Sequence, residues 1–287
     1  MAKIIHEHAR SAATDSRATL LGAAALFATV MGLFLAIQSQ LPTLIGWTES
    51  FDRGLLAAVN SHARRSQAFD ALVWAVSGDY AIQGGVMLAV FCWAWFASPD
   101  TPEGLERRQT LLSSMIALYV AVILALVVRD SLAFRLRPAS DALVGFQMPY
   151  LPAGVTLSRE TSSFPSGHAT VFFALATGLW WVSPRLGSLG LVHAVVIACL
   201  PRVYLGYHFP SDILAGALLS IATVSLVNAA LHRLPALAQA VTWSHRRPAA
   251  FYAALMLMSV EIATEFASVR TVLQMLSSAH LRRLVMH

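Results

Sequence analysis

Charged residues are scarce in this sequence of 287 residues. Asp, Glu, Lys and Arg make up 12% of it, where soluble proteins have about 25%. Hydrophobic residues make up 57%, and the mean hydropathy is +0.63. So little polar material cannot coat a water-soluble globule, which excludes soluble enzymes, secreted modules and disordered regulators. The composition indicates a membrane protein.

Lysine and cysteine are also nearly absent. Lys3 is the only lysine among 20 basic residues, so arginine must fill any role that lysine has elsewhere. The arginines are scattered singly or in pairs, and we therefore expect no nucleic-acid partner despite the formal charge of +5. Cys92 and Cys199 lie in apolar stretches and are interpreted as small buried side chains rather than as a disulfide or metal ligands.

Six apolar stretches are candidates to cross a bilayer core of about 30 Å as helices. The first is expected to be a retained anchor, because a polar lead precedes it and no small-residue cleavage site follows. The sequence thus predicts an all-α polytopic protein with a six-helix transmembrane core. The six stretches are residues 18–38, 82–98, 111–128, 167–182, 188–205 and 213–231.

Two other segments have helical periodicity mixed with charge. Residues 51–81 read as one or two amphipathic helices at the membrane interface. Residues 249–276 carry Glu261 and Glu265 on one face, which favours an interfacial helix over a seventh span and leaves both open. No repeat or linker divides the chain, so residues 1–287 are expected to form one integral domain with its core at 111–231.

Lys and Arg residues flank the spans in similar numbers on both sides. If four arginines with a functional interpretation are set aside (129, 135, 137 and 202), the excess lies on the side of the N-terminus, and the positive-inside rule predicts both termini in the cytoplasm. Three polar clusters then meet at the outer face: residues 129–138, residues 163–168, and Arg202 with His208 and Asp212.

These clusters contain the groups that bind phosphate. Pro165 suits the first turn of a helix, and Gly167 keeps the free N–H groups and the positive dipole end of that helix accessible to an anion. Ser166 adds a hydroxyl donor. Arg137 and Arg202 offer planar forks that match phosphate oxygens.

Two histidines supply the chemistry for phosphoryl transfer without a metal. A neutral imidazole attacks phosphorus, and a protonated one gives its proton to the leaving oxygen. Asp212 follows His208 by one helical turn and can orient its ring. Each cluster alone is more often a helix cap or a helix entry, whereas the three on one face favour catalysis.

With these motifs, the sequence resembles the type 2 phosphatidic acid phosphatase superfamily. Its signature Pro-Ser-Gly-His is matched in full by residues 165–168. The signature Ser-Arg-x5-His-x3-Asp is matched by Arg202, His208 and Asp212, with Pro201 in place of the serine.

The remaining signature, Lys-x6-Arg-Pro, is matched only at Arg137 and Pro138. Asp130 stands at the lysine position, and Arg129 or Arg135 is the candidate to take over that role. Without this lysine the site lacks one expected phosphate ligand, which is expected to affect the catalytic efficiency or the type of substrate.

The resemblance implies a role for each matched residue. His208 is the nucleophile that forms a phospho-histidine, His168 is the acid for the leaving group, and Asp212 is the partner of His208. No metal or other cofactor is implied. The implied phosphate ligands are Arg137, Arg202, Ser166 and Gly167, with Arg129 and Arg135 as further candidates.

The implied function is hydrolysis of a lipid phosphate or diphosphate, such as undecaprenyl diphosphate or a phosphatidate-type lipid. Expected partners are this substrate and the surrounding membrane lipids, and the oligomeric state stays open. A composition rich in Arg and Ala indicates a bacterium, and hence an inner membrane with the site facing the periplasm. The loop 139–163, with Phe146 and Tyr150, is either a roof over the site or an inert connector.

Two alternatives remain at this point. In a lipid phosphotransferase, an acceptor hydroxyl instead of water would attack the phospho-histidine. A transporter or catalytically inactive member is favoured by Asp130 and Pro201, and opposed by the presence of His168, His208 and Asp212.

Overall fold

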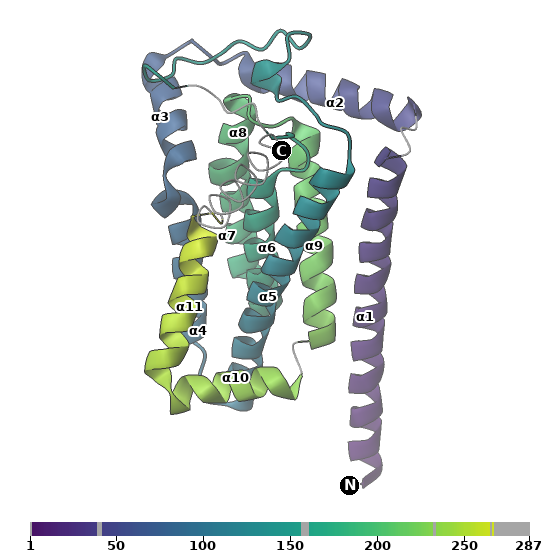
Figure 1. Cartoon of the computed structure of the whole chain (residues 1–287). Coiled ribbons are helices and arrows are strands. Elements are labelled where there is room, and N and C mark those ends of the chain that lie inside the picture. The colour runs from purple at the N-terminus through teal and green to yellow at the C-terminus, as the bar shows by residue number, and fades with distance from the viewer. Residues whose placement is uncertain (1, 39–41, 156–160, 232–233, 265, 267–287) are drawn as a thin grey trace, which may run out of the picture.

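The computed structural model describes residues 2–38, 42–155, 161–231, 234–264 and 266. Within these ranges the regular structure is entirely helical, with no strand, which confirms the all-α prediction (Figure 1). The helices form an upright bundle, with one helix lying across each of its two ends.

Three helices pack at the centre of the bundle: α5 (Pro102–Ser131), α6 (Gly167–Val182) and α9 (Pro210–Leu231). Small residues permit their close approach. A Cβ atom on Gly178 of α6 would lie 2.6 Å from the Cβ of Ser114 on α5. Asn228 of α9 donates to Ser114 Oγ at 2.8 Å and accepts from Ser113 Oγ, so the contact also has a polar bridge.

The other long helices surround this centre. α1 (Ala2–Gln38) packs along α9, with Val30 and Phe34 buried in the contact. A continuous helical path runs through α7 (Pro184–His193), the π-helical turn η3 (Ala194–Cys199) and α8 (Leu200–Tyr204).

The α3 helix (Gln67–Gly78) is followed after a bend of 63° by η1 (Ala81–Gly85) and α4 (Val86–Phe96). It begins where the Ser66 hydroxyl accepts from the Phe69 N–H at 3.3 Å. α2 (Pro42–Asn60) instead lies across the end of the bundle. One or two interfacial helices were expected in residues 51–81. The α2 helix lies crosswise, whereas α3 runs along the bundle as part of a bent pair.

All six predicted spans lie in helical segments. Four of them are long and apolar enough to cross a membrane, and the α3–α4 pair makes a fifth if it is counted as one span. α6 has only 16 residues, and because other helices surround it, it is apolar on every face. The chain is a multi-pass membrane protein. The four passing ranges are Ala18–Ile37, Pro102–Ser131, Pro184–Tyr204 and Pro210–Leu231.

Two helices follow α9. α10 (Pro235–Arg246), which sequence reasoning did not anticipate, lies across the end of the bundle opposite α2 (Figure 1). α11 (Pro248–Ala263) returns alongside α4 and is an apolar helix of 16 residues, below the length needed for a span. Glu265 and residues 267–276 of the predicted C-terminal segment lie outside the described residues.

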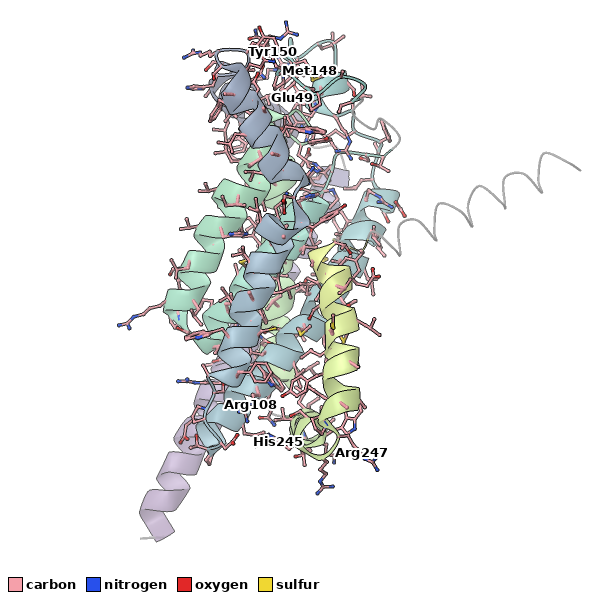
Figure 2. The ribbon with its side chains drawn as sticks, turned by 90° about the vertical axis from the view of Figure 1, so that its left-hand side faces the viewer. Glu49, Arg108, Met148, Tyr150, His245 and Arg247 are labelled. Carbon is pink, nitrogen blue, oxygen red and sulfur yellow. The ribbon has the colours of Figure 1, made fainter. Side chains whose placement is uncertain are left out.

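The two ends of the bundle differ in their side chains. Figure 2 shows Glu49, Met148 and Tyr150 at one end, and Arg108, His245 and Arg247 at the other. The three sequence clusters of the predicted site belong to the end with Tyr150, where α5 and α8 finish and α6 and α9 begin.

Candidate active site

The start of α6 is held directly against the start of α9. Ser166 is the N-cap of α6, and its hydroxyl accepts from the Ala169 N–H at 3.3 Å. The Ser166 N–H donates to the carbonyl oxygen of Asp212 at 3.0 Å. The helix begins at Gly167, so Pro165 precedes the cap, and its predicted place in the first turn is wrong by two residues.

Gly167 leaves open space at this helix end. It is exposed, and a Cβ atom added to it would meet no atom within 4 Å. As the first residue of α6 it has an N–H for which a helix offers no carbonyl partner. An anion can therefore approach the positive end of the α6 dipole here without a steric obstacle.

His208 lies in the loop between α8 and α9, and only 6% of it is exposed. Its Nδ1 atom lies 2.8 Å from the carbonyl oxygen of Ser163. Because a carbonyl oxygen only accepts, Nδ1 carries the hydrogen, and Nε2 of the neutral ring keeps its lone pair. This is the tautomer that a nucleophile at Nε2 requires.

Burial lowers the pKa of His208 below its ordinary value, which keeps the ring neutral at pH 7. Asp212 opposes this effect, while Arg137 adds to it. The distance from His208 Nδ1 to Asp212 Oδ2 is 3.7 Å, too long for a hydrogen bond, so Asp212 acts on the ring through its charge.

The loop that carries His208 needs a glycine. Gly206 has φ +73°, a left-handed conformation that other residues rarely adopt. A Cβ atom there would also lie 2.7 Å from the Phe146 ring. Its carbonyl oxygen accepts from the Ala139 N–H at 3.0 Å, which ties the loop to the segment after Arg137.

Arg202 joins the second and third motifs. Its Nη2 atom donates to His168 Nε2 and, at 2.8 Å, to the carbonyl oxygen of Ser77 at the end of α3. The guanidinium also lies 5.1 Å from the ring centre of Tyr207. The structure thus brings His168 and Arg202 together at the N-terminal end of α6.

Arg137, which belongs to the Arg-Pro signature, also lies close to the loop that carries His208. It donates to the carbonyl oxygen of Tyr207 at 2.8 Å and to the Thr161 hydroxyl at 2.9 Å. Its Nε atom is buried and makes no hydrogen bond, and among the described residues no carboxylate pairs with it. Arg137 therefore retains charge and a donor for an anion.

The two arginines proposed to replace the missing lysine have other partners. Arg135 donates to Asp212 Oδ1 and to Asp52 Oδ2, each at 2.6 Å, so its charge is balanced by carboxylates inside the site. Arg129 pairs with Asp130 at 2.9 Å at the end of α5 and touches none of the described site residues. Their role as phosphate ligands stays a prediction.

The segment between α5 and α6 alternates in its exposure. Phe134 and Leu136 are 58% and 48% exposed, while Arg135 and Arg137 turn toward the site. Successive side chains of an extended segment point to opposite sides. These four residues thus present an apolar face outward and two guanidinium groups inward.

Sequence reasoning missed the side chains that hold the site from α2 and α3. Asp52 is buried beside Arg135, and it shares a helix face with Leu56, a pattern that a helical projection of residues 51–59 would have shown. Asp70 of α3 accepts from the Tyr150 N–H at 2.8 Å and from the Tyr204 hydroxyl. No pattern in the sequence pointed to Asp70.

The loop of residues 139–155 is fixed over this region. Asn60 exchanges two hydrogen bonds of 2.8 Å with the backbone of Gln147. Phe146 packs with Leu56, Val203 and Phe209. That this loop roofs the site for a lipid stays a prediction.

Residues 109–235 match the sequence model of the PAP2 superfamily. Over this region the chain is similar to that superfamily. The match contains all nine predicted site residues, from Arg129 to Asp212, and excludes α2 with Asp52. The PAP2 region thus coincides with the predicted motif-bearing core.

Curated proteins that resemble this chain include one from Escherichia coli and one from Sulfolobus acidocaldarius. The Escherichia coli K12 protein named "Putative undecaprenyl-diphosphatase YbjG" is 35% identical over 133 residues, which are 46% of this chain and 59% of that protein. The undecaprenyl-diphosphatase of Sulfolobus acidocaldarius is 43% identical over 58 residues, 20% of this chain and 28% of the relative. The chain therefore spans less than two thirds of either relative.

Among solved structures, a transmembrane PAP2-type phosphatidylglycerolphosphate phosphatase from Bacillus subtilis is similar to this chain. The similarity covers 71% of this chain and 93% of the other, with 23% identity and a TM-score of 0.43.

Proposed function

We propose that the chain is a membrane phosphatase that removes phosphate from a lipid phosphate or diphosphate through a phospho-histidine. The observation that carries the proposal is the geometry of His208: the ring is buried, and its Nδ1 lies 2.8 Å from the Ser163 carbonyl oxygen. Only a ring in this state has an Nε2 lone pair directed away from its anchor. The ring lies in a region that also holds two arginines and the open end of α6.

The reaction would begin with the phosphate at the start of α6. The N–H of Gly167 and the guanidinium groups of Arg137 and Arg202 would bind its oxygens. His208 Nε2 attacks phosphorus, a P–N bond forms, and the bond from phosphorus to the leaving oxygen breaks. Once Arg202 turns to the phosphate, His168 Nε2 loses the hydrogen bond that it accepts from Arg202, takes up a proton beside the anionic phosphate and donates that proton to the leaving oxygen.

Water would complete the cycle. His168, now neutral, takes a proton from the water that attacks phosphorus, the P–N bond breaks, and inorganic phosphate leaves. During both steps His208 carries positive charge, which the nearby carboxylate of Asp212 stabilises. This assigns every proton to a residue of the chain.

A lipid is the substrate class that the surroundings support. Phe134 and Leu136, which alternate with Arg135 and Arg137, are exposed, and so is Trp47 on α2 at the same end of the bundle; such residues suit the headgroup level of a membrane. Both relatives named above are described as undecaprenyl-diphosphatases, which supports a polyprenyl diphosphate as the first candidate.

We further propose a bacterial inner membrane with the site facing the periplasm. Arg108, His245 and Arg247 lie at the opposite end of the bundle (Figure 2), where a positive-inside orientation would put the cytoplasm.

The proposal is tested by phosphate release from the detergent-purified protein, in EDTA, with a panel of lipid mono- and diphosphates. Wild type should release phosphate, His208→Ala should not, and His245→Ala, a histidine at the other end of the bundle, should match wild type. Transfer of the phosphoryl group to an added acceptor lipid, without release of inorganic phosphate, would instead identify a phosphotransferase. No turnover of any substrate under either condition would contradict the proposal.

A further inference from the structure

A buried aspartate of α2 reaches into the site from outside the PAP2 region. Asp52 is 2% exposed. Its Oδ1 accepts from the Ser211 N–H at 2.8 Å, and its Oδ2 accepts from the Ser211 hydroxyl and from Arg135 Nη2, each at 2.6 Å. Three donors thus fix one carboxylate beside the first turn of α9.

Arg135 connects this carboxylate to the histidine partner. Its Nη1 atom donates to Asp212 Oδ1 and to the Ser211 hydroxyl at 2.8 Å, and its guanidinium lies 4.1 Å from the ring centre of Phe209. Asp212 is fully buried, and its Oδ2 accepts from the Phe209 N–H at 2.7 Å. These contacts leave Asp212 little freedom to rotate.

The charges in this group decide what Asp52 does. Asp212 and Arg135 alone would form a neutral pair, which could give little stabilisation to an imidazolium at His208. With Asp52 added, two carboxylates surround one guanidinium and the group carries one net negative charge. Since both carboxylates are buried, this charge is poorly screened by water or salt.

We infer that Asp52 is a positioning residue for the proposed reaction: it holds Arg135 and Ser211 and leaves Asp212 its negative charge toward His208. The inference rests on the proposed function, and it makes α2 part of the site although α2 lies outside the PAP2 match.

The pH dependence of kcat/KM measures this charge. Its acid limb reports the ionisation of His208 in the free enzyme. Asp52→Asn keeps the shape but removes a negative charge, so the His208 pKa should fall and the acid limb should move to lower pH, by about half a unit to one unit. Loss of position should lower kcat by about 10²-fold.

Two variants separate charge from packing. Asp52→Glu keeps the charge, so its acid limb should stay at the wild-type pH even if kcat falls. Glu49→Gln removes the same charge from an exposed position one turn earlier on α2, where Glu49 pairs with Arg53 at 3.4 Å. It should match wild type in both kcat and limb.

Arg135→Gln supplies a second, opposite test. It removes the positive charge, so the net charge of the group changes from −1 to −2 and the acid limb should move to higher pH. The double variant with Asp52→Asn has a net charge of −1 again, so its acid limb should return to the wild-type pH. If Asp52→Asn is not monodisperse in gel filtration, Arg135→Gln and Asp52→Glu carry the test.

The results distinguish a failure of the proposed function from a failure of the role proposed for Asp52. An inactive wild type contradicts the proposed function. An active wild type with an inactive His208→Ala, but with the same acid limb in all Asp52 and Arg135 variants, overturns the role of Asp52 alone.

Discussion

His208 Nδ1 lies 2.8 Å from the carbonyl oxygen of Ser163, three residues before the cap of α6. One hydrogen bond thus sets the tautomer of the proposed nucleophile and joins the loop before α9 to the loop before α6. The Ser166 N–H, which donates to the Asp212 carbonyl oxygen, makes the same connection a second time.

The first prediction concerns pH. Because burial lowers the pKa of His208, the acid limb of kcat/KM should lie below the ordinary range for histidine, with activity lost as His208 is protonated. Arg137→Gln removes a charge that lowers this pKa, so its limb should move to higher pH. Asp212→Asn should move it the opposite way. A limb that is the same in all three proteins would contradict the assignment of His208.

A second prediction concerns the open space at Gly167. Gly167→Ala adds a Cβ that touches no protein atom, so the Tm should stay near that of wild type while kcat/KM falls because the methyl group crowds the phosphate. Gly216→Ala is the matched contrast. Its Cβ would lie 2.5 Å from the Ser166 carbonyl oxygen, which should cost about 1–3 kcal/mol of stability. Wild-type activity in Gly167→Ala would argue against phosphate binding there.

Much of the fold could be predicted because its signals are local. Apolar stretches gave the helices, including the one that starts at Gly167. The bend between α3 and η1 was not found, although its signal is local: Asp79 Oδ1 accepts from the Ala81 and Ile82 N–H groups and starts a new helix there. The contacts of Asp52 could not be predicted, since its partners Arg135 and Ser211 are distant in sequence.

The third prediction concerns the loop over the site. Replacing Phe146 and Tyr150 by serine removes apolar contacts with Val203 and Phe209 and leaves the backbone bonds of the loop to Asn60 and Asp70 in place. If the loop roofs a lipid, kcat/KM should fall for long-chain substrates and little for a water-soluble phosphate ester. Equal turnover of long-chain substrates by this variant and wild type would make the loop a connector.

A fourth prediction concerns the anchor of that loop. Asp70→Ala leaves the Tyr150 and Arg64 N–H groups without their acceptor and leaves the Tyr204 hydroxyl only the His62 carbonyl oxygen at 3.3 Å, which should cost about 1–3 kcal/mol for each unsatisfied group. The Tm in detergent should fall accordingly. Asp141→Ala, in an exposed turn of the same loop, is the control and should leave the Tm unchanged. Equal Tm values for both variants would show that Asp70 does not hold the loop.

The phosphorylated intermediate tests the central claim most directly. A lipid phosphate labelled with ³²P is mixed with the protein, the reaction is quenched within milliseconds, and the protein-bound label is assayed for stability in alkali and lability in acid. The account predicts an alkali-stable, acid-labile label on wild type and on His245→Ala, and none on His208→Ala. A label that persists in His208→Ala, or turnover by wild type with no label on the protein at any time, would contradict it.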